Sequence, residues 1–422
     1  MGHKYHALMK KIVPLFVLVL LAVQLPAQTI LPAAYRIPVY LPLLKGKKVG
    51  VFANHTATVG DKHLVDTLLS LGVKITKAFG PEHGFRGKAD AGEKVNNYID
   101  SATGIPVVSL YGAKRKPTPE DLADVDILLF DIQDVGTRFY TYISSLQEFM
   151  EAAFENSKPM MLLDRPNPNG FYIDGPVLDT SYRSFVGMQP IPVVYGMTIA
   201  EYAFMIAGEN WLSTKANEKY AYYRRAENSK DTLFHFQVIK CANYTHSSKY
   251  QLPVKPSPNL PDMASVYWYA STCFFEGTAL SEGRGTDHPF CIFGHPSLPK
   301  NLYAFTPTSR DGAREPKLKN QVCYGLNLFD NNETVLKKID NRLQIGYLLE
   351  AYKLFPDKDK FFRKPKSDNP KAYSFNLLAG SRQLMDQLVA GKTEAEIRAS
   401  WQPGIEAFKK VRKKYLLYTD FE

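Results

Sequence analysis

The sequence has few cysteines and lacks the short motifs of the common cofactor enzymes. Four cysteines occur in 422 residues, and none belongs to a C-x-x-C pair. So few thiols do not support a disulfide-dependent fold, and the missing pairs argue against structural zinc. No G-x-G-x-x-G follows the first expected strand and no G-x-x-x-x-G-K-[ST] occurs, which argues against dinucleotides and P-loop nucleotides. We therefore expect no cofactor and assign no metal ligands.

Long apolar runs are also scarce. One covers residues 12–25, follows Lys4, Lys10 and Lys11, and is followed by the small residue Ala27. This order predicts an export signal over residues 1–27. The run is shorter than the ~20 residues that a membrane-spanning helix needs. We expect a periplasmic or secreted protein with no stable membrane insertion after the signal is removed.

Positive charge exceeds negative charge only modestly. The formal net charge is +10, and the basic residues occur in short, separate runs. Such runs are usually solvated surfaces. The sequence therefore does not indicate a nucleic-acid partner, while an acidic extracellular polymer remains an alternative.

From residue 46 to about 210, apolar β-type runs alternate with amphipathic stretches. Strands that are apolar throughout and are joined by helices are typical of a mostly parallel sheet covered on both faces. The expected strands are 47–54, 73–79, 105–111, 125–132 and 159–164, and the expected helices are 63–72 and 140–157. This pattern predicts a doubly wound α/β domain.

The later sequence is less regular. It contains a helical pattern at 198–209, a strand-like run at 236–241, and three helical stretches at 334–354, 373–390 and 394–415. A chain of this length exceeds the usual size of a single core. We expect a catalytic domain over residues 28–285 and a smaller α+β domain over residues 286–422.

Polar residues and glycines follow the expected strands where each strand ends. The stretches are "NHT" (54–56), "GPEHGFRG" (80–87), "YG" (111–112), "DIQDVGTRFY" (131–140) and "DRPNPNG" (164–170). One Asp after a strand is often only a helix cap. Because ligands bind beyond the carboxyl ends of strands in such sheets, five stretches in succession favour a functional site at this edge.

Loop carboxylates are the candidates for chemistry. Glu82 lies in a turn between Pro81 and His83, where Asp or Asn would cap better, so we interpret it as functional. Two carboxyl groups across a cleft could hydrolyse a glycosidic bond. Other loop carboxylates are Asp131, Asp164, Glu276 and Glu282. For Asp164, which precedes Arg165, an ion pair or cap is the favoured interpretation.

Several neighbouring residues have more than one interpretation. His83 could be an acid/base group, a partner of Glu82 or an ordinary packed histidine. Arg86 could pair with a carboxylate of the protein or of a ligand. Arg284, between two glycines, could hold an anionic group or form a surface ion pair. Asn259 lies in the proline-rich "PSPNLP", and its amide suits a sugar hydroxyl or acetamido group.

Six ordered motifs together resemble the NamZ-type exo-β-N-acetylmuramidases over about residues 45–420. They are "NHT", "GPEHGFRG", "DIQDVGTRFYTY", "LDRPNPNG", "PSPNLP" and "FEGTALSEGRGT". The resemblance implies a Rossmann-like domain, a smaller auxiliary domain and an active site between them. It also implies an exported glycoside hydrolase that releases N-acetylmuramic acid from the non-reducing end of peptidoglycan fragments.

The resemblance further implies roles for particular residues. Glu82 would be the general acid/base, with His83 in the same element. The cleft would be lined by Asn54, Arg138, Asp164, Asn259, Glu276, Glu282 and Arg284. We add Arg86 and Asp131 as candidate substrate contacts.

Two other functions remain open at this point. A non-catalytic periplasmic protein that binds amino sugars or muropeptide fragments could also use two domains around a cleft. The excess of carboxylates beside glycines argues against it, because pure binding favours amides and aromatics. Hydrolysis of another amino-sugar or acyl linkage is the third possibility.

Overall fold

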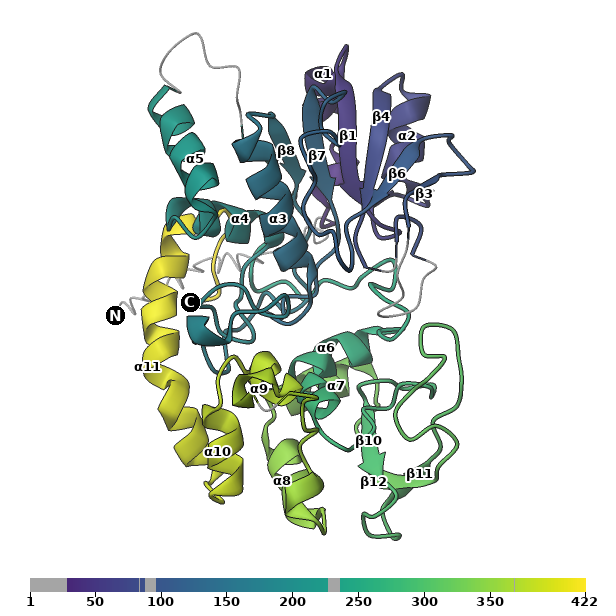
Figure 1. The fold of residues 1–422 in the computed structure, drawn as a ribbon, viewed down its shortest axis with the longest axis vertical. Coiled ribbons are helices and arrows are strands. Elements are labelled where there is room, and N and C mark those ends of the chain that lie inside the picture. Colours follow the sequence, from purple (N-terminus) through teal and green to yellow (C-terminus); the bar gives the residue numbers. More distant parts are fainter. Residues whose placement is uncertain (1–28, 83, 88–95, 227–235, 368) are drawn as a thin grey trace, which may run out of the picture.

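The computed structural model describes residues 29–82, 84–87, 96–226, 236–367 and 369–422. The expected export signal and His83 therefore lie outside the described residues. Figure 1 shows an upper part built on a large sheet and a lower part built of helices and a small sheet. No helix among the described residues has the length and apolar character that crossing a membrane requires.

The upper part contains a seven-stranded sheet in the order β5-β6-β4-β1-β7-β8-β9. All neighbouring strands are parallel except the edge pair of β5 and β6. The strands are β1 (Lys48–Ala53), β4 (Lys74–Gly80), β5 (Tyr98–Ile99), β6 (Pro106–Ser109), β7 (Ile127–Asp131), β8 (Met160–Leu163) and β9 (Phe236–Ile239). The predicted doubly wound α/β class is confirmed, and the run at 236–241 joins this sheet as β9.

Helices cover both faces of the large sheet. They are α1 (Ile37–Leu44), α2 (Leu64–Ser70), α3 (Tyr142–Glu155), α4 (Ile199–Gly208) and α5 (Thr214–Ala226), and a short hairpin joins β2 (Thr58–Val59) and β3 (Lys62–His63). In β1, Phe52 packs under α3, with its ring centroid 5.1 Å from that of Phe149, while Val51 packs on the opposite face with Leu68 of α2. Because both faces are buried, the central strands β1, β7 and β8 are apolar over most of their length.

The lower part contains a three-stranded antiparallel sheet in the order β10-β12-β11. Its strands are β10 (Ile292–His295), β11 (Tyr303–Phe305) and β12 (Cys323–Asn327). The remaining helices are α6 (Met263–Thr272), α7 (Asn332–Ile339), α8 (Gly346–Leu354), α9 (Ser374–Ala379), α10 (Gln383–Val389) and α11 (Glu394–Arg412). Short 3₁₀ helices occupy Ala33–Tyr35, Thr180–Tyr182, Cys273–Gly277, Lys358–Lys360, Pro370–Ala372 and Lys413–Tyr415.

Two of the three helical stretches expected near the C-terminus are each divided into two helices. The stretch at 334–354 breaks after α7, where Asp340 adopts a left-handed conformation with φ of 51°. The stretch at 373–390 breaks after α9, where Gly380 has φ of 81°. A left-handed residue ends a helix by turning the chain away from its axis. The amphipathic pattern continues across both breaks because the flanking helices pack on the same core.

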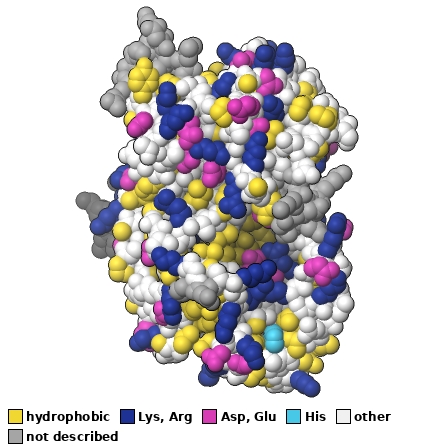
Figure 2. Space-filling view, in the orientation of Figure 1, with side chains coloured by type: hydrophobic (Ala, Val, Ile, Leu, Met, Phe, Trp, Pro, Cys, Tyr) yellow, Lys and Arg dark blue, Asp and Glu magenta, His cyan; other side chains and the backbone are white. Residues whose placement is uncertain are grey.

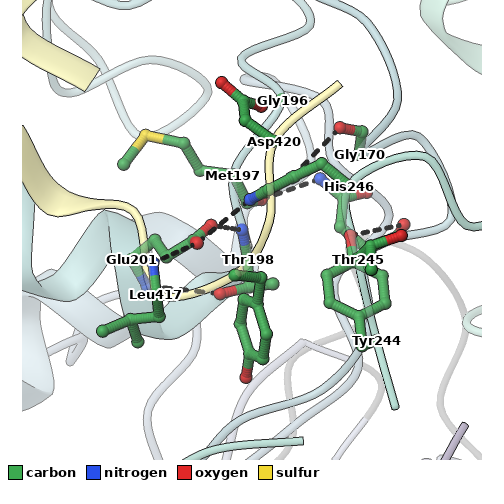
Figure 3. Close-up of polar contacts among 12 residues, drawn as sticks. Gly170, Gly196, Met197, Thr198, Glu201, Tyr244, Thr245, His246, Leu417 and Asp420 are labelled. Carbon is green, nitrogen blue, oxygen red and sulfur yellow. Dashed lines mark hydrogen bonds and ion pairs between the residues drawn. The ribbon is translucent and has the colours of Figure 1, made fainter. Parts of the chain in front are cut away.

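The C-terminal segment returns to the upper part. Helix α11 runs along one side of the molecule from the lower part to the upper part (Figure 1). The backbone N–H of Leu417 then donates to Glu201 of α4 at 2.7 Å, and the same carboxyl oxygen lies 3.0 Å from His246 Nε2 (Figure 3). The backbone N–H of His246 donates to the carbonyl of Thr419. These contacts fix the chain end against the large sheet and its helices.

A buried arginine also ties the two parts together. Arg138, which follows β7, donates to the carbonyls of Pro176 and Ile191 at 2.7 Å and of Leu378 in α9 at 2.8 Å. Its side chain is fully buried, and burial lowers its pKa to about 9. Arg138 therefore acts as a hydrogen-bond donor that fills the junction between the upper part and α9.

We predict that Arg138→Met lowers the free energy of unfolding by about 3 kcal/mol, because three buried carbonyls lose their donor. Denaturant unfolding followed by circular dichroism measures the change. The matched control is Arg382→Met, which removes an exposed arginine paired with Asp386 and should cost less than about 0.5 kcal/mol. Equal effects of the two substitutions would contradict this role of Arg138.

Candidate active site

A pocket lies where the carboxyl edge of the large sheet meets the lower part. Its space, counted together with the open solvent at its mouth, is about 450 Å³. Its lining residues are Glu82, Phe139, Tyr140, Thr141 and Tyr142 from the sheet edge, and Ser257, Asn259, Leu260, Tyr269, Arg284 and Phe290 from the facing segments. Figure 2 shows hydrophobic and basic side chains around the hollow between the two parts. The pocket is thus at the edge that the sequence indicated.

Glu82 is held by side chains that follow neighbouring strands. It comes two residues after β4 ends, and its Oε1 accepts a hydrogen bond of 2.8 Å from Tyr111 Oη. Thr141, just before α3, lies 3.5 Å from the other carboxyl oxygen. Burial raises the pKa of Tyr111, and the charge of Glu82 raises it further, so Tyr111 stays protonated and acts as the donor. The orientation of Glu82 is therefore fixed.

Asn54 supports the floor of the pocket. Its Nδ2 donates to Tyr142 Oη at 2.7 Å, while its Oδ1 accepts bonds from the backbone and hydroxyl of Thr56. The ring of Tyr142 meets that of Tyr140 edge to face at 4.7 Å, and Tyr140 Oη donates to the carbonyl of Pro256. Asn54 is fully buried, so it shapes the pocket through Tyr142.

Asn259 lies on the opposite wall. Its Nδ2 donates to the carbonyl of Gly312 at 2.7 Å, and its backbone N–H donates to Ser257 Oγ. The first bond requires the NH₂ side of the amide to face Gly312, so the carbonyl oxygen is left to accept a hydrogen bond from a ligand.

Arg284 is the positive group of the pocket. Its Nη2 donates to Glu276 at 2.5 Å, and its Nε lies 3.2 Å from Glu282. Glu282 also pairs with Lys317 at 2.8 Å. Burial alone would raise the pKa of Glu282, but the positive charges of Lys317 and Arg284 outweigh it and lower the pKa below its ordinary value. Glu282 is therefore anionic near neutral pH.

Comparison with known proteins decides the family. The N-terminal model of the exo-β-N-acetylmuramidase NamZ matches residues 49–264, and the C-terminal model matches residues 267–418. The chain belongs to this family. It is 38% identical over 397 residues to the peptidoglycan β-N-acetylmuramidase NamZ of Bacillus subtilis, covering 90% of this chain and 89% of that protein. The chain is accordingly a glycoside hydrolase, and the expectation of an enzyme is confirmed.

Two solved structures of Bacteroides fragilis proteins, both described as DUF1343 family members, have the same fold. One is 42% identical with a TM-score of 0.80, over 93% of this chain and 99% of its own. The other is 30% identical with a TM-score of 0.73, over 92% of this chain and 99% of its own. The NamZ-type fold expected from the motifs is therefore confirmed along nearly the whole chain.

The pocket brings together only some of the residues that the sequence indicated. Glu82, Asn259 and Arg284 line it, while Asn54, Glu276 and Glu282 contact lining residues. Arg86 instead pairs with Asp66 at 2.9 Å and Asp100 at 2.7 Å. Of the two alternatives left open for Arg86, the structure thus shows pairing with carboxylates of the protein.

Asp131, Arg138 and Asp164 are fully buried and do not line the pocket. Asp131 forms a buried ion pair with Arg165, whose Nε is 2.6 Å away. In agreement with the favoured interpretation of an ion pair or cap, Asp164 Oδ1 accepts from the backbone N–H of Ala200 in the first turn of α4, as a cap does. Arg165 pairs through its side chain with β7 rather than with Asp164. Its backbone N–H does donate to Asp164.

Tyr111, Thr141 and Lys317 contact the site residues but were not singled out in the sequence. Tyr111 lies in the stretch "YG" (111–112), which the sequence placed after a strand, but it was not named as a site residue; it comes two residues after β6 ends. Thr141 lies in the motif "DIQDVGTRFYTY", but a threonine before a helix resembles a simple helix cap. Lys317 occurs in a basic loop with no motif. Among the residues that the structure describes, no group of three or more side chains is arranged to hold a metal ion.

Asp164 anchors the chain end beneath the sheet edge. Tyr418 Oη donates to it at 2.5 Å, and the backbone N–H of Ala200 donates at 3.1 Å. Burial raises its pKa to about 7, with the bond from Tyr418 acting in the opposite sense. The folded state therefore binds this proton more tightly than the unfolded state, in which the pKa is close to 3.9.

This difference predicts a pH-dependent stability contribution. Between about pH 4 and pH 7 the folded state holds more protons at Asp164, so this contribution to stability falls as the pH rises. The Asp164→Asn variant has no ionisable group at this position. The free energy of unfolding of the wild type minus that of the variant should therefore fall as the pH rises through this window. Denaturant unfolding at several pH values measures it. Asp61→Asn, in an exposed turn, is the control, and a pH-independent difference for Asp164→Asn would contradict the assignment.

Proposed function

We propose that this enzyme removes terminal N-acetylmuramic acid from the non-reducing end of peptidoglycan fragments, with Glu82 as the general acid. The observation that carries the proposal is the placement of one carboxylate and one arginine on the same pocket, Glu82 from the sheet edge and Arg284 from the facing segment. The Bacillus subtilis relative is a peptidoglycan β-N-acetylmuramidase, and this activity supports the same substrate for the present enzyme.

The lining chemistry suits an acidic N-acetyl sugar. Tyr140, Tyr269 and Phe290 provide aromatic surface for a sugar ring. The carbonyl oxygen of Asn259 can accept a hydrogen bond from the acetamido N–H. Arg284 can pair with the lactyl carboxylate, which distinguishes N-acetylmuramic acid from N-acetylglucosamine. The family to which the chain belongs is described as exo-acting, which supports removal of a terminal sugar.

The environment of Glu82 suits proton donation. Tyr111 donates to Oε1, so the proton of the neutral acid belongs on Oε2, the oxygen on the side of Thr141. A proton in this position can pass to the glycosidic oxygen as the bond to the leaving sugar breaks, while water forms the new bond to the anomeric carbon and gives up a proton. The two hydrogen bonds also restrict the rotamer of Glu82, which keeps the donor oriented before the substrate arrives.

We further propose that the enzyme acts outside the cytoplasm, in the periplasm or after secretion. The support is the order of lysines, apolar run and small residue over residues 1–27, which is typical of an export signal. Peptidoglycan fragments are available in that location.

We predict that Glu82→Gln reduces kcat by about 10²–10⁴-fold while KM changes little, because the amide keeps the shape of the side chain but cannot donate an acidic proton. A chromogenic β-glycoside of N-acetylmuramic acid measures the rate. Glu333→Gln, an exposed residue of α7 paired with Lys337, is the matched control.

The wild-type enzyme should cleave this glycoside and should cleave the N-acetylglucosamine counterpart far more slowly. Near-normal release of N-acetylmuramic acid by the Glu82→Gln variant would remove Glu82 as the acid. Preferred cleavage of the N-acetylglucosamine glycoside by wild type would contradict the proposed substrate.

A further inference from the structure

Arg284 belongs to a group of four charged side chains, which we call the Arg284 charge cluster: Glu276, Glu282, Arg284 and Lys317. Arg284 contacts both glutamates, and Lys317 contacts Glu282 from the side away from Arg284, through the other carboxyl oxygen. The cluster has two positive and two negative members. Only Arg284 lines the pocket.

The members differ in how firmly they are held. The Glu282 side chain is 3% exposed and forms ion pairs with two cations. Lys317 also donates to the carbonyls of Phe275 at 2.7 Å and Thr278 at 3.2 Å, which fixes its position. Glu276 is 29% exposed and forms an ion pair with Arg284. Glu282 and Lys317 are therefore held firmly, while Glu276 is the most exposed member of the cluster.

The charge balance has a consequence for anion binding. Arg284 directs Nε and one N–H of Nη2 at the two glutamates, so the two N–H groups of Nη1 and the second N–H of Nη2 are the donors left for a ligand. Without Lys317, Arg284 and its two glutamates would carry a net charge of −1 and would repel a ligand carboxylate. With Lys317 the four charges sum to zero. The N–H groups of Arg284 can then donate to a ligand carboxylate without net electrostatic repulsion from the cluster.

We propose that Lys317 and Glu276 set the preference of the pocket for an anionic over a neutral sugar, in opposite directions. Lys317 is a positioning residue that acts through Glu282 and Arg284, and it does not touch the sugar. Glu276 competes with the ligand carboxylate for Arg284. This inference rests on the proposed function, because it concerns the lactyl carboxylate of N-acetylmuramic acid.

The test uses two chromogenic glycosides that differ only in charge: the N-acetylmuramic acid glycoside, and its derivative in which the lactyl carboxylate is converted to the amide. The measured quantity is the ratio of kcat/KM for the acid to kcat/KM for the amide. Lys317→Met should lower this ratio about tenfold, and Glu276→Gln should raise it by a similar factor, since each changes the cluster by one unit of charge within several ångströms of the ligand.

The double variant Lys317→Met/Glu276→Gln restores a neutral cluster and should return the ratio to near the wild-type value. Damage to the fold would not produce such a recovery. Lys319→Met is the matched control, because this lysine lies on the same loop but pairs with the exposed Glu315; its ratio should equal that of wild type. The shifts should shrink at high ionic strength.

An unchanged ratio in both single variants, or a fall in both, would overturn the inference. If Lys317→Met does not fold, Glu276→Gln still decides, because it alters a partly exposed side chain and must raise the ratio. Failure of the proposed function looks different, since wild type would then cleave neither glycoside. Cleavage of the acid glycoside with no response to Glu276→Gln would leave the proposed function standing and remove this inference alone.

Discussion

Burial of both faces of the parallel sheet is the constraint on which the rest of the molecule depends. Phe52 and Val51 are neighbours in β1, yet each is fully buried, one under α3 and the other against α1 and α2. Such a sheet has no exposed face on which polar chemistry could be placed. Reactive side chains are therefore restricted to the loops at the carboxyl edge, which is where Glu82, Tyr111 and Thr141 meet.

The lower part completes the site because it supplies what the sheet edge lacks. Asn259 and Arg284 come from segments that are fixed by their own hydrogen bonds and ion pairs, to Gly312 and to Glu276 and Glu282. Arg138 and the C-terminal segment hold the two parts in place. The geometry of the pocket thus depends on contacts made between residues that are far apart in the sequence.

The sequence predicted elements where the signal is local, and it was less informative where partners are distant. Helix α4 begins at a capping box of Thr198 and Glu201, and the apolar strands have no other stable placement. By contrast, Arg86 and Asp131 are residues of a type often found in active sites, but they form ion pairs within the protein, with Asp100 and Arg165 respectively. No pattern in one sequence reveals such pairs. The same is true of Lys317, whose role depends on a glutamate 35 positions away in the chain (residues 317 and 282).

The central claim is that one sugar lies between Glu82 and Arg284. The most direct measurement is a crystal structure of the Glu82→Gln variant with an uncleaved disaccharide that has N-acetylmuramic acid at its non-reducing end. The account predicts that the glycosidic oxygen lies within about 3 Å of the side chain at position 82 and the lactyl carboxylate within about 3 Å of the Arg284 guanidinium. A sugar bound outside this pocket, or one whose carboxylate points away from Arg284, would contradict it.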